Sequence, residues 1–205
     1  MVTRGSPKPL LRVRILLPLP ESQFRKRLVF LIFGRRAVNI IIINGPMGVG
    51  KTTVGTHIAE TNAGTAFVDG DWCMDIHPFV GNRETKAMAI DNILHMIGNY
   101  SRCSACRMVV LVWLMDDAWV RERILNGVSI MKLDVRSVTL ICGKDELVRR
   151  WKSDHACQWR TDKWLEASLR SLSAFEQMEN TIDTSGLSVE QVAETVMRQP
   201  LKTPH

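Results

Sequence analysis

The residues whose types and spacing indicate chemistry lie in two short stretches of this 205-residue chain. The first stretch places Gly45, Gly48 and Gly50 directly before Lys51 and Thr52. Glycines let the main chain bend so that successive N–H groups point at one anion. A lysine adds a mobile cation, and a hydroxyl group can serve as a ligand of Mg²⁺. The spacing Gly-x-x-x-x-Gly-Lys-Thr therefore predicts a loop that wraps the phosphates of a nucleotide.

The surroundings of this loop agree with that prediction, because it follows an apolar run at 38–43 and precedes a helical pattern at 51–61. The amino end of such a helix adds partial positive charge. A glycine turn that only caps a helix would explain the glycines but not the lysine and threonine. We expect ATP as the nucleotide, Thr52 as a ligand of Mg²⁺, and phosphate contacts from Gly45, Pro46, Met47, Gly48, Val49, Gly50, Lys51, Thr52 and Thr53.

The second stretch, Phe67-Val68-Asp69-Gly70-Asp71, ends another apolar run about 20 residues further on. In a parallel sheet the carboxyl ends of the strands lie at one edge, which would put both aspartates beside the loop. One carboxylate could hold Mg²⁺ while the other orients a hydroxyl group and accepts its proton. An Asp-Gly turn that simply closes a strand is the alternative.

Together, residues 45–53 and 67–71 resemble the small-molecule kinase branch of the P-loop fold, especially the gluconate kinase and shikimate kinase group and related nucleoside and nucleotide kinases. The similar rhythm of strands and helices covers about residues 38–198. The resemblance implies that Asp69 lies near the metal and that Asp71 binds the acceptor hydroxyl. It also implies a basic lid at about residues 149–163, where Arg160 is the first candidate and Arg150 the second for stabilising the transferring phosphoryl group.

Other positions remain open on the sequence alone. Residues 72–78 do not match the substrate-binding sequence expected for gluconate or shikimate, so the acceptor does not follow from the resemblance. Asp116 is either a second metal-side carboxylate or the start of a helix, and residues 184–186 either contact adenine or form an ordinary turn. Arg83 and Arg170 are weaker candidates for contact with the substrate.

The elements that must position these residues alternate along the chain. The pattern predicts strands at 38–43, 65–68, 108–114, 135–142 and 181–183, and helices at 51–61, 84–99, 117–125, 145–151, 163–179 and 188–198. Several strands are continuous apolar runs, as burial on both faces requires. We therefore expect an α/β fold of the P-loop NTPase class, with a doubly wound five-stranded parallel sheet, helices on both faces and a helical lid.

The charge distribution separates a leader from the body of the protein. Residues 1–37 contain nine basic side chains and one acidic one, while the other 168 residues contain 18 basic and 20 acidic ones, although the whole chain carries a net charge of +6. The near-neutral body argues against nucleic acid as a partner. We expect a disordered leader at 1–37, either a targeting segment or a non-native extension, then a kinase-like domain at 38–199 and a tail at 200–205.

Cysteines and apolar runs bear on the location of the protein. Five cysteines without a disulfide-dense spacing favour a reducing, cytoplasmic compartment. Cys103 and Cys106 have a metal-binding spacing but lack a second pair, which argues against structural zinc. The apolar runs at 28–33 and 40–43 are far shorter than the roughly 20 residues that span a bilayer, so we expect no membrane partner. We expect a monomer or a homodimer.

The leading hypothesis is an ATP-dependent kinase with a small-molecule acceptor, such as a sugar acid, a nucleoside or nucleotide, or an antibiotic hydroxyl. Lys51 would hold the phosphates, Asp71 would prepare the acceptor, and a lid arginine would stabilise the transferring group. The alternative is a regulatory P-loop NTPase that hydrolyses ATP or GTP without such an acceptor. The usual guanine-selecting motif, Asn-Lys-x-Asp, is absent, since the chain offers only Gly143-Lys144-Asp145. A binding module without turnover is disfavoured by the intact Lys51 and the aspartate pair.

Overall fold

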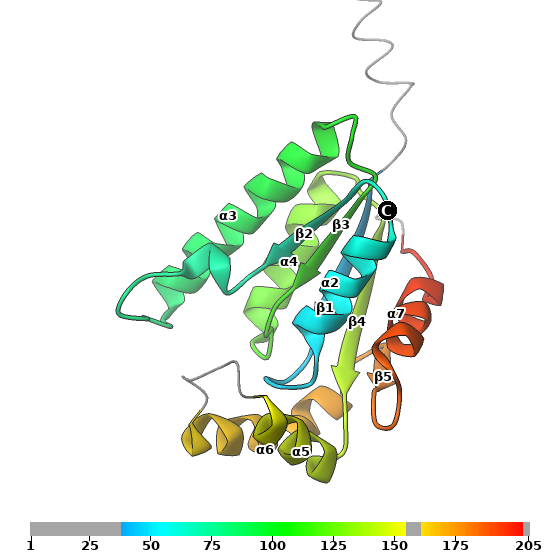
Figure 1. The fold of residues 1–205 in the computed structure, drawn as a ribbon. Helices are drawn as coiled ribbons and strands as arrows, with labels where there is room; N and C mark the ends of the chain where they lie inside the picture. The colour runs from blue at the N-terminus through cyan, green and yellow to red at the C-terminus, as the bar shows by residue number, and fades with distance from the viewer. Residues whose placement is uncertain (1–37, 155–160, 203–205) are drawn as a thin grey trace, which may run out of the picture. The chain divides into compact units, whose positions relative to one another are not determined.

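The computed structural model describes residues 38–154 and 161–202, which belong to one compact unit. Its centre is a sheet of five strands in the order β2-β3-β1-β4-β5, and every neighbouring pair is parallel (Figure 1). The strands are β1 (Asn39–Asn44), β2 (Thr65–Asp69), β3 (Met108–Val112), β4 (Val135–Ile141) and β5 (Thr181–Asp183). The predicted five-stranded parallel sheet is confirmed, whereas the predicted leader at 1–37 lies outside the described residues.

Helices cover both faces of this sheet (Figure 1). They are α2 (Lys51–Thr61), the short 3-10 helix η1 (Trp72–Met74), α3 (Arg83–Arg102), α4 (Ala118–Ile130), α5 (Lys144–Ser153), α6 (Asp162–Glu176) and α7 (Val189–Arg198). No helix among the described residues combines the length and apolar character needed to cross a bilayer. Described residues of the predicted tail include Lys202, which makes a main-chain bridge with Val135.

The central strand β1 shows why both faces must be covered. Ile40 and Ile42 belong to a buried apolar cluster with α3 and α4, while Ile41 and Ile43 belong to a second cluster with α2 and α7. All four side chains are at most 1% exposed. Successive side chains of a strand point to opposite faces, so an uninterrupted apolar run needs a hydrophobic layer on each side.

Three helices extend further than the periodicity predicts, and one of them is α5, which is predicted at 145–151 and spans Lys144–Ser153. The helix predicted at 117–125 continues to Ile130, and the helix predicted at 84–99 continues to Arg102. Gly127 does not end α4, because it is the point where α4 approaches Leu94 of α3: a Cβ at Gly127 would lie 2.5 Å from the Leu94 methyl groups. By propensity alone a glycine favours a helix end, but here close packing against α3 explains why a glycine stands inside α4.

Helix α2 lies unusually close to the sheet at Gly55. A Cβ at this position would lie 2.5 Å from Cγ1 of Val112 and 2.9 Å from Cε2 of Phe67, so a side chain there would collide with β3 and β2. This close approach fixes the height of α2 above the sheet and therefore the position of the loop that leads into its amino end.

We expect Gly55→Ala to lower the free energy of unfolding by about 1–3 kcal/mol, because the added methyl group overpacks the interface between α2 and the sheet. Gly98→Ala in α3 is the matched control, since the nearest atom to its Cβ would be 3.4 Å away in a flexible arginine side chain. That variant should be neutral or stabilising by up to about 1 kcal/mol. Urea unfolding measures both, and equal effects of the two variants would contradict the close approach at Gly55.

Candidate active site

The loop between β1 and α2 is compressed against neighbouring elements at two glycines. A Cβ at Gly45 would lie 2.4 Å from the main-chain oxygen of Leu140 in β4, and the φ angle of Gly45 is +143°. A Cβ at Gly48 would lie 3.1 Å from the ring of Trp151 in α5, with φ at +84°. Only glycine satisfies both conditions without strain. These glycines therefore bring the loop close to β4 and α5 and allow backbone conformations with positive φ that other residues rarely adopt.

Lys51 and Thr52 begin α2 directly after this loop. The ammonium group of Lys51 lies over the loop and donates hydrogen bonds to the main-chain oxygens of Gly45 and Pro46, both at 2.8 Å. Oγ1 of Thr52 donates to Oδ2 of Asp69 at 3.3 Å. The structure thus brings together the predicted phosphate cation and the two residues predicted to lie at the metal.

The oxygen atoms of Thr52 and Asp69 suit a hard divalent cation such as Mg²⁺, which prefers oxygen ligands and usually keeps several waters and substrate phosphates in its coordination shell. Residues 38–154 and 161–202 contain no cluster of three or more His, Cys, Asp and Glu side chains arranged for a metal ion. The oxygen atoms of Thr52 and Asp69 would leave the other ligand positions of such an ion to waters and to the phosphates of a nucleotide.

The carboxylate of Asp69 is partly buried at the end of β2. Burial is the largest influence on this group and raises its pKa, and the neighbouring charge of Asp71 acts in the same direction. The N–H of Asp71, which donates to Oδ1 of Asp69 at 3.0 Å, the Thr52 hydroxyl and the Lys51 ammonium group oppose the increase. A carboxylate in this state gains from any additional cation nearby.

Asp71 is held by a residue that the sequence patterns did not single out. Nε1 of Trp113 donates to Oδ1 of Asp71 at 3.1 Å, and the indole is almost completely buried just beyond β3. Gly70 makes this contact possible, because a Cβ there would lie 2.2 Å from Cγ of Trp113. The available signal was the position of Trp113 at the carboxyl end of β3, the strand that pairs with β2.

A cavity of about 490 Å³ opens beside the loop and is formed by three separate segments. The loop and α2 contribute Val49 and Thr53, α5 contributes Glu146 and Arg150, and the segment between β5 and α7 contributes residues that include Thr184 and Gly186. This volume lies in the usual range for ligand sites. Thr184 and Gly186, from the segment for which both adenine contact and an ordinary turn were left open, therefore line the same cavity as the phosphate loop.

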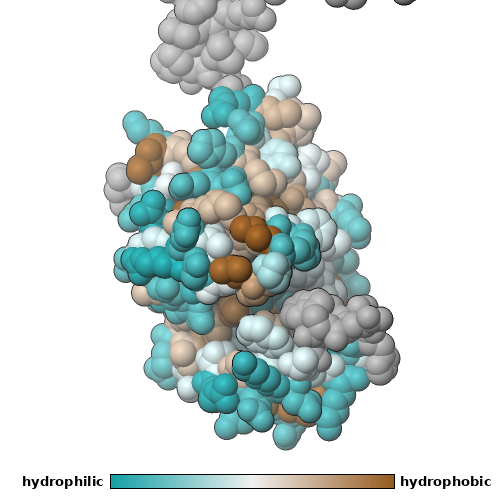
Figure 2. Space-filling view, turned by 90° about the vertical axis from the view of Figure 1, so that its left-hand side faces the viewer, coloured by the Kyte–Doolittle hydropathy of each residue, from teal (hydrophilic) through white to brown (hydrophobic). Residues whose placement is uncertain are grey.

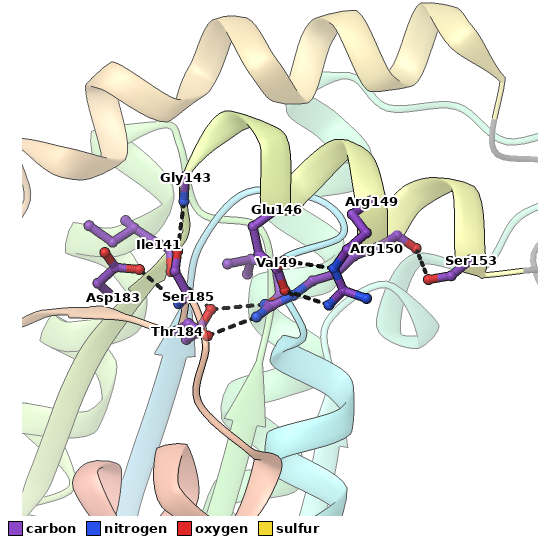
Figure 3. A network of polar contacts seen from close by, with 10 residues as sticks. All are labelled: Val49, Ile141, Gly143, Glu146, Arg149, Arg150, Ser153, Asp183, Thr184 and Ser185. Atoms are coloured by element: carbon purple, nitrogen blue, oxygen red, sulfur yellow. Dashed lines mark hydrogen bonds and ion pairs between the residues drawn. The ribbon is translucent and has the colours of Figure 1, made fainter.

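Arg150 joins the three segments through its guanidinium group (Figure 3). Nη1 donates to the main-chain oxygen of Val49 at 2.8 Å and to Oγ1 of Thr184 at 2.9 Å, and Nη2 donates to the main-chain oxygen of Thr184 at 2.8 Å. Nε donates to Oε1 of Glu146 at 2.6 Å. The planar fork of arginine allows one side chain to satisfy four acceptors, one within α5 and three from distant parts of the chain.

Glu146 fixes the direction of this arginine from within α5. Hydrogen bonds from Arg149 and Arg150 lower the pKa of Glu146 to about 2, so its carboxylate stays charged at neutral pH (Figure 3). Ser185 adds a link of its own to α5, since its Oγ accepts from the N–H of Gly143 at 3.0 Å. The cavity wall formed by α5 and by the segment after β5 is thus fixed by polar contacts.

The remaining candidates do not join this cluster. Arg83 stacks over the ring of Trp119 at 4.1 Å, and Arg170 forms an exposed ion pair with Glu166 at 3.6 Å. Asp117, and not Asp116, caps helix α4 by accepting from the N–H of Trp119. Arg160 and residues 155–159 of the predicted lid lie outside the described residues, so the role of Arg160 stays a prediction.

Comparisons with known proteins agree with this arrangement. The family described as AAA domain matches residues 41–168, more than half of the chain. The structure of a tunicamycin resistance protein of Deinococcus radiodurans is similar with a TM-score of 0.60 and 27% identity, and the match covers 82% of this chain and 99% of that one. No curated protein matches the sequence.

Two kinase structures share the fold at lower identity. A gluconokinase from Sinorhizobium meliloti 1021 has a TM-score of 0.58 and 17% identity over 79% of this chain and 91% of that one. A shikimate kinase from Bacteroides thetaiotaomicron has a TM-score of 0.54 and 19% identity over 78% of this chain and 95% of that one. The predicted resemblance to the P-loop small-molecule kinases is thereby confirmed for the fold.

We expect Asp69→Asn to make the ligand-free protein more stable at pH 7 by less than about 1 kcal/mol, because the ionised carboxylate is buried at a cost that the amide avoids. A raised pKa means that this cost disappears as the pH falls through it and Asp69 takes up a proton. The gain should therefore shrink between pH 7 and pH 4 in urea unfolding.

Asp75→Asn provides the control. Asp75 lies six residues after Asp69, and its side chain is 64% exposed, so its carboxylate is not buried at a cost. Its effect should stay within about 0.5 kcal/mol at every pH in this range. A loss of stability in Asp69→Asn at pH 7 would contradict the interpretation that its burial is unfavourable.

Proposed function

This chain belongs to the AAA domain family, and from that premise we propose that it is a kinase that transfers the γ-phosphoryl group of ATP to a hydroxyl group of a small molecule. The observation that carries the proposal is the hydrogen bond between Thr52 and Asp69. It supports placing the aspartate pair next to the phosphate-binding loop, where the outer phosphates of a nucleotide would lie. Hydrolysis of nucleotide alone does not require a second carboxylate at this point.

The residues divide the work of phosphoryl transfer as follows. The loop N–H groups and Lys51 hold the phosphates, and Lys51 exchanges its present partners in the loop for phosphate oxygens. Thr52 and Asp69 would hold Mg²⁺, which neutralises charge on the phosphates when it is bound. Asp71 orients the acceptor hydroxyl and takes its proton, while the Trp113 indole keeps one of its oxygens fixed.

The base of ATP occupies the cavity of about 490 Å³ in this proposal. Arg150 positions the cavity wall by tying Val49 of the loop to Thr184. Arg160 stays our candidate for a cation that approaches the transferring group from the lid, with Arg150 as the second candidate. A cytoplasmic location and a monomeric or homodimeric state belong to the same proposal.

The first test is ATP consumption by the full chain with a panel of sugar acids, nucleosides, nucleotides and neutral alcohols. We expect turnover only when an acceptor is present, and Lys51→Met should lower it by at least about 100-fold because the phosphates lose their cation. Steady hydrolysis without any acceptor would instead identify a regulatory NTPase and overturn the kinase proposal.

We expect Asp71→Asn to lower kcat by about 10²- to 10⁴-fold, the usual contribution of a general base, while the affinity for ATP changes less than about threefold. Asp75→Asn, four residues further on and exposed, is the matched control and should retain kcat. An unchanged kcat in Asp71→Asn would remove this residue as the base.

Arg150→Lys separates the two roles of this arginine. Lysine lacks the planar fork and cannot reach Val49, Glu146 and Thr184 together, so we expect the KM for ATP to rise roughly tenfold with a smaller change in kcat. Arg198→Lys is the control, because Arg198 is exposed and pairs with Glu194 in α7 without lining the cavity. A fall in kcat at constant KM would assign Arg150 to the chemical step instead.

A further inference from the structure

The segment directly after Asp71 exposes an unusual set of large apolar side chains. Trp72 is 77% exposed and Phe79 is 59% exposed, and Ile76 and Val80 are also exposed. The segment lies at the left edge of Figure 1 and faces the viewer in Figure 2, where hydrophobic residues emerge among hydrophilic ones. Single exposed apolar residues need no explanation, but four of them within nine positions beside a reactive carboxylate indicate a contact surface.

This segment is anchored at both ends. At its start, Nδ2 of Asn92 in α3 donates to the main-chain oxygen of Cys73 at 2.9 Å. At its end, Oγ1 of Thr85 donates to the main-chain oxygen of Val80 at 2.6 Å, and Asn82 and Thr85 form a reciprocal cap of α3. The apolar side chains are therefore presented from a fixed backbone, which lowers the entropy lost when a ligand binds.

A cavity of about 390 Å³ adjoins this segment between the free edge of β2 and helix α3. Trp72 and Asp69 both line it, together with Phe67, Cys73, Met96 and the polar side chains of Asn92, His95 and Asn99. Its volume is sufficient for an alkyl chain or an aromatic ring. The cavity thus begins at Asp69 and Trp72 and continues along α3.

The charges of this region disfavour an anionic ligand. Residues 70–82 contain Asp71 and Asp75 but no lysine or arginine. The first cations beyond them have protein partners, since Arg83 stacks on Trp119 and Lys86 pairs with Asp117 at 3.7 Å. An acceptor that carries a phosphate or carboxylate would meet like charge in this segment without a cation of its own.

We propose that the acceptor is an uncharged molecule whose reactive hydroxyl is attached to an alkyl or aryl group. The hydroxyl lies at Asp71, and the apolar group lies against Trp72 and Phe79 and in the cavity beside β2. This inference rests on the proposed kinase function and narrows it, because sugar acids and nucleotides are then poor acceptors.

The binding test uses n-octyl β-D-glucoside below its micelle concentration and methyl β-D-glucoside, which carry the same free hydroxyl groups. With the full chain and a non-hydrolysable ATP analogue, we expect the octyl compound to bind at least tenfold more tightly in calorimetry. Trp72→Ser and Phe79→Ser should each remove most of this difference and leave the affinity for the ATP analogue unchanged. Ile130→Ser, at an 82% exposed position at the end of α4, is the matched control and should change neither value.

The activity test compares paired acceptors in ATP consumption: methyl and octyl glucoside, glycerol and 1-O-octylglycerol, and the anions gluconate and AMP. In the glucoside pair and in the glycerol pair we expect the octyl compound to have the higher kcat/KM, by roughly tenfold or more. The two anions should be the poorest acceptors. Gluconate or AMP as the best acceptor would overturn this inference and leave the kinase proposal intact.

Two further results have distinct meanings. Octyl glucoside that binds at Trp72 while no acceptor in the panel raises ATP consumption would overturn the kinase function together with this inference. A dimer in light scattering that Trp72→Ser and Phe79→Ser convert to a monomer would assign the surface to a second copy of the chain and overturn the inference alone.

Discussion

The phosphate loop depends on close contact with two elements that lie far from it in the sequence. Gly45 approaches the main chain of β4, and Gly48 approaches the Trp151 ring in α5. A loop with several left-handed residues is costly in isolation, because glycine loses much conformational entropy when it is ordered. Packing of the loop against β4 and α5 offsets part of that cost. The sheet order, in which β4 lies next to β1, brings the main chain of β4 close to Gly45.

The parallel sheet also fixes the position of the aspartate pair. β2 and β3 are in register from Thr65 with Met108 to Asp69 with Val112, so the residues after both strands emerge at one edge. There Gly70 admits the indole of Trp113, which holds Asp71, while Asp69 contacts the hydroxyl of Thr52. The unfavourable burial of Asp69 and the positive charge of Lys51 partly compensate each other, and a bound cation would shift that balance further toward the ionised carboxylate.

Sequence reasoning predicted those parts of the site that are local in the chain. The loop at 45–53 and the aspartates at 69 and 71 are each defined by a few consecutive residues, and the alternation of strands and helices predicted the five-stranded parallel sheet but not the order of its strands. Trp113 and the partners of Arg150 were missed because their contacts span 42 residues in one case and 34 and 101 residues in the other. No local periodicity encodes such pairs. The extra length of α4 was missed for a related reason, since Gly127 is retained by its contact with α3.

The proposed site has a nucleotide side that is fixed by directional hydrogen bonds and an acceptor side that presents apolar side chains. The side that would hold the base is fixed by charged hydrogen bonds around Arg150, which define one geometry for one cofactor. The acceptor side presents Trp72 and Phe79 from a backbone that is hydrogen-bonded at both ends, and apolar contact is not directional. Such a surface would favour a class of acceptors over a single compound, while in the proposed mechanism Asp71 and its indole partner would set where the reacting hydroxyl lies.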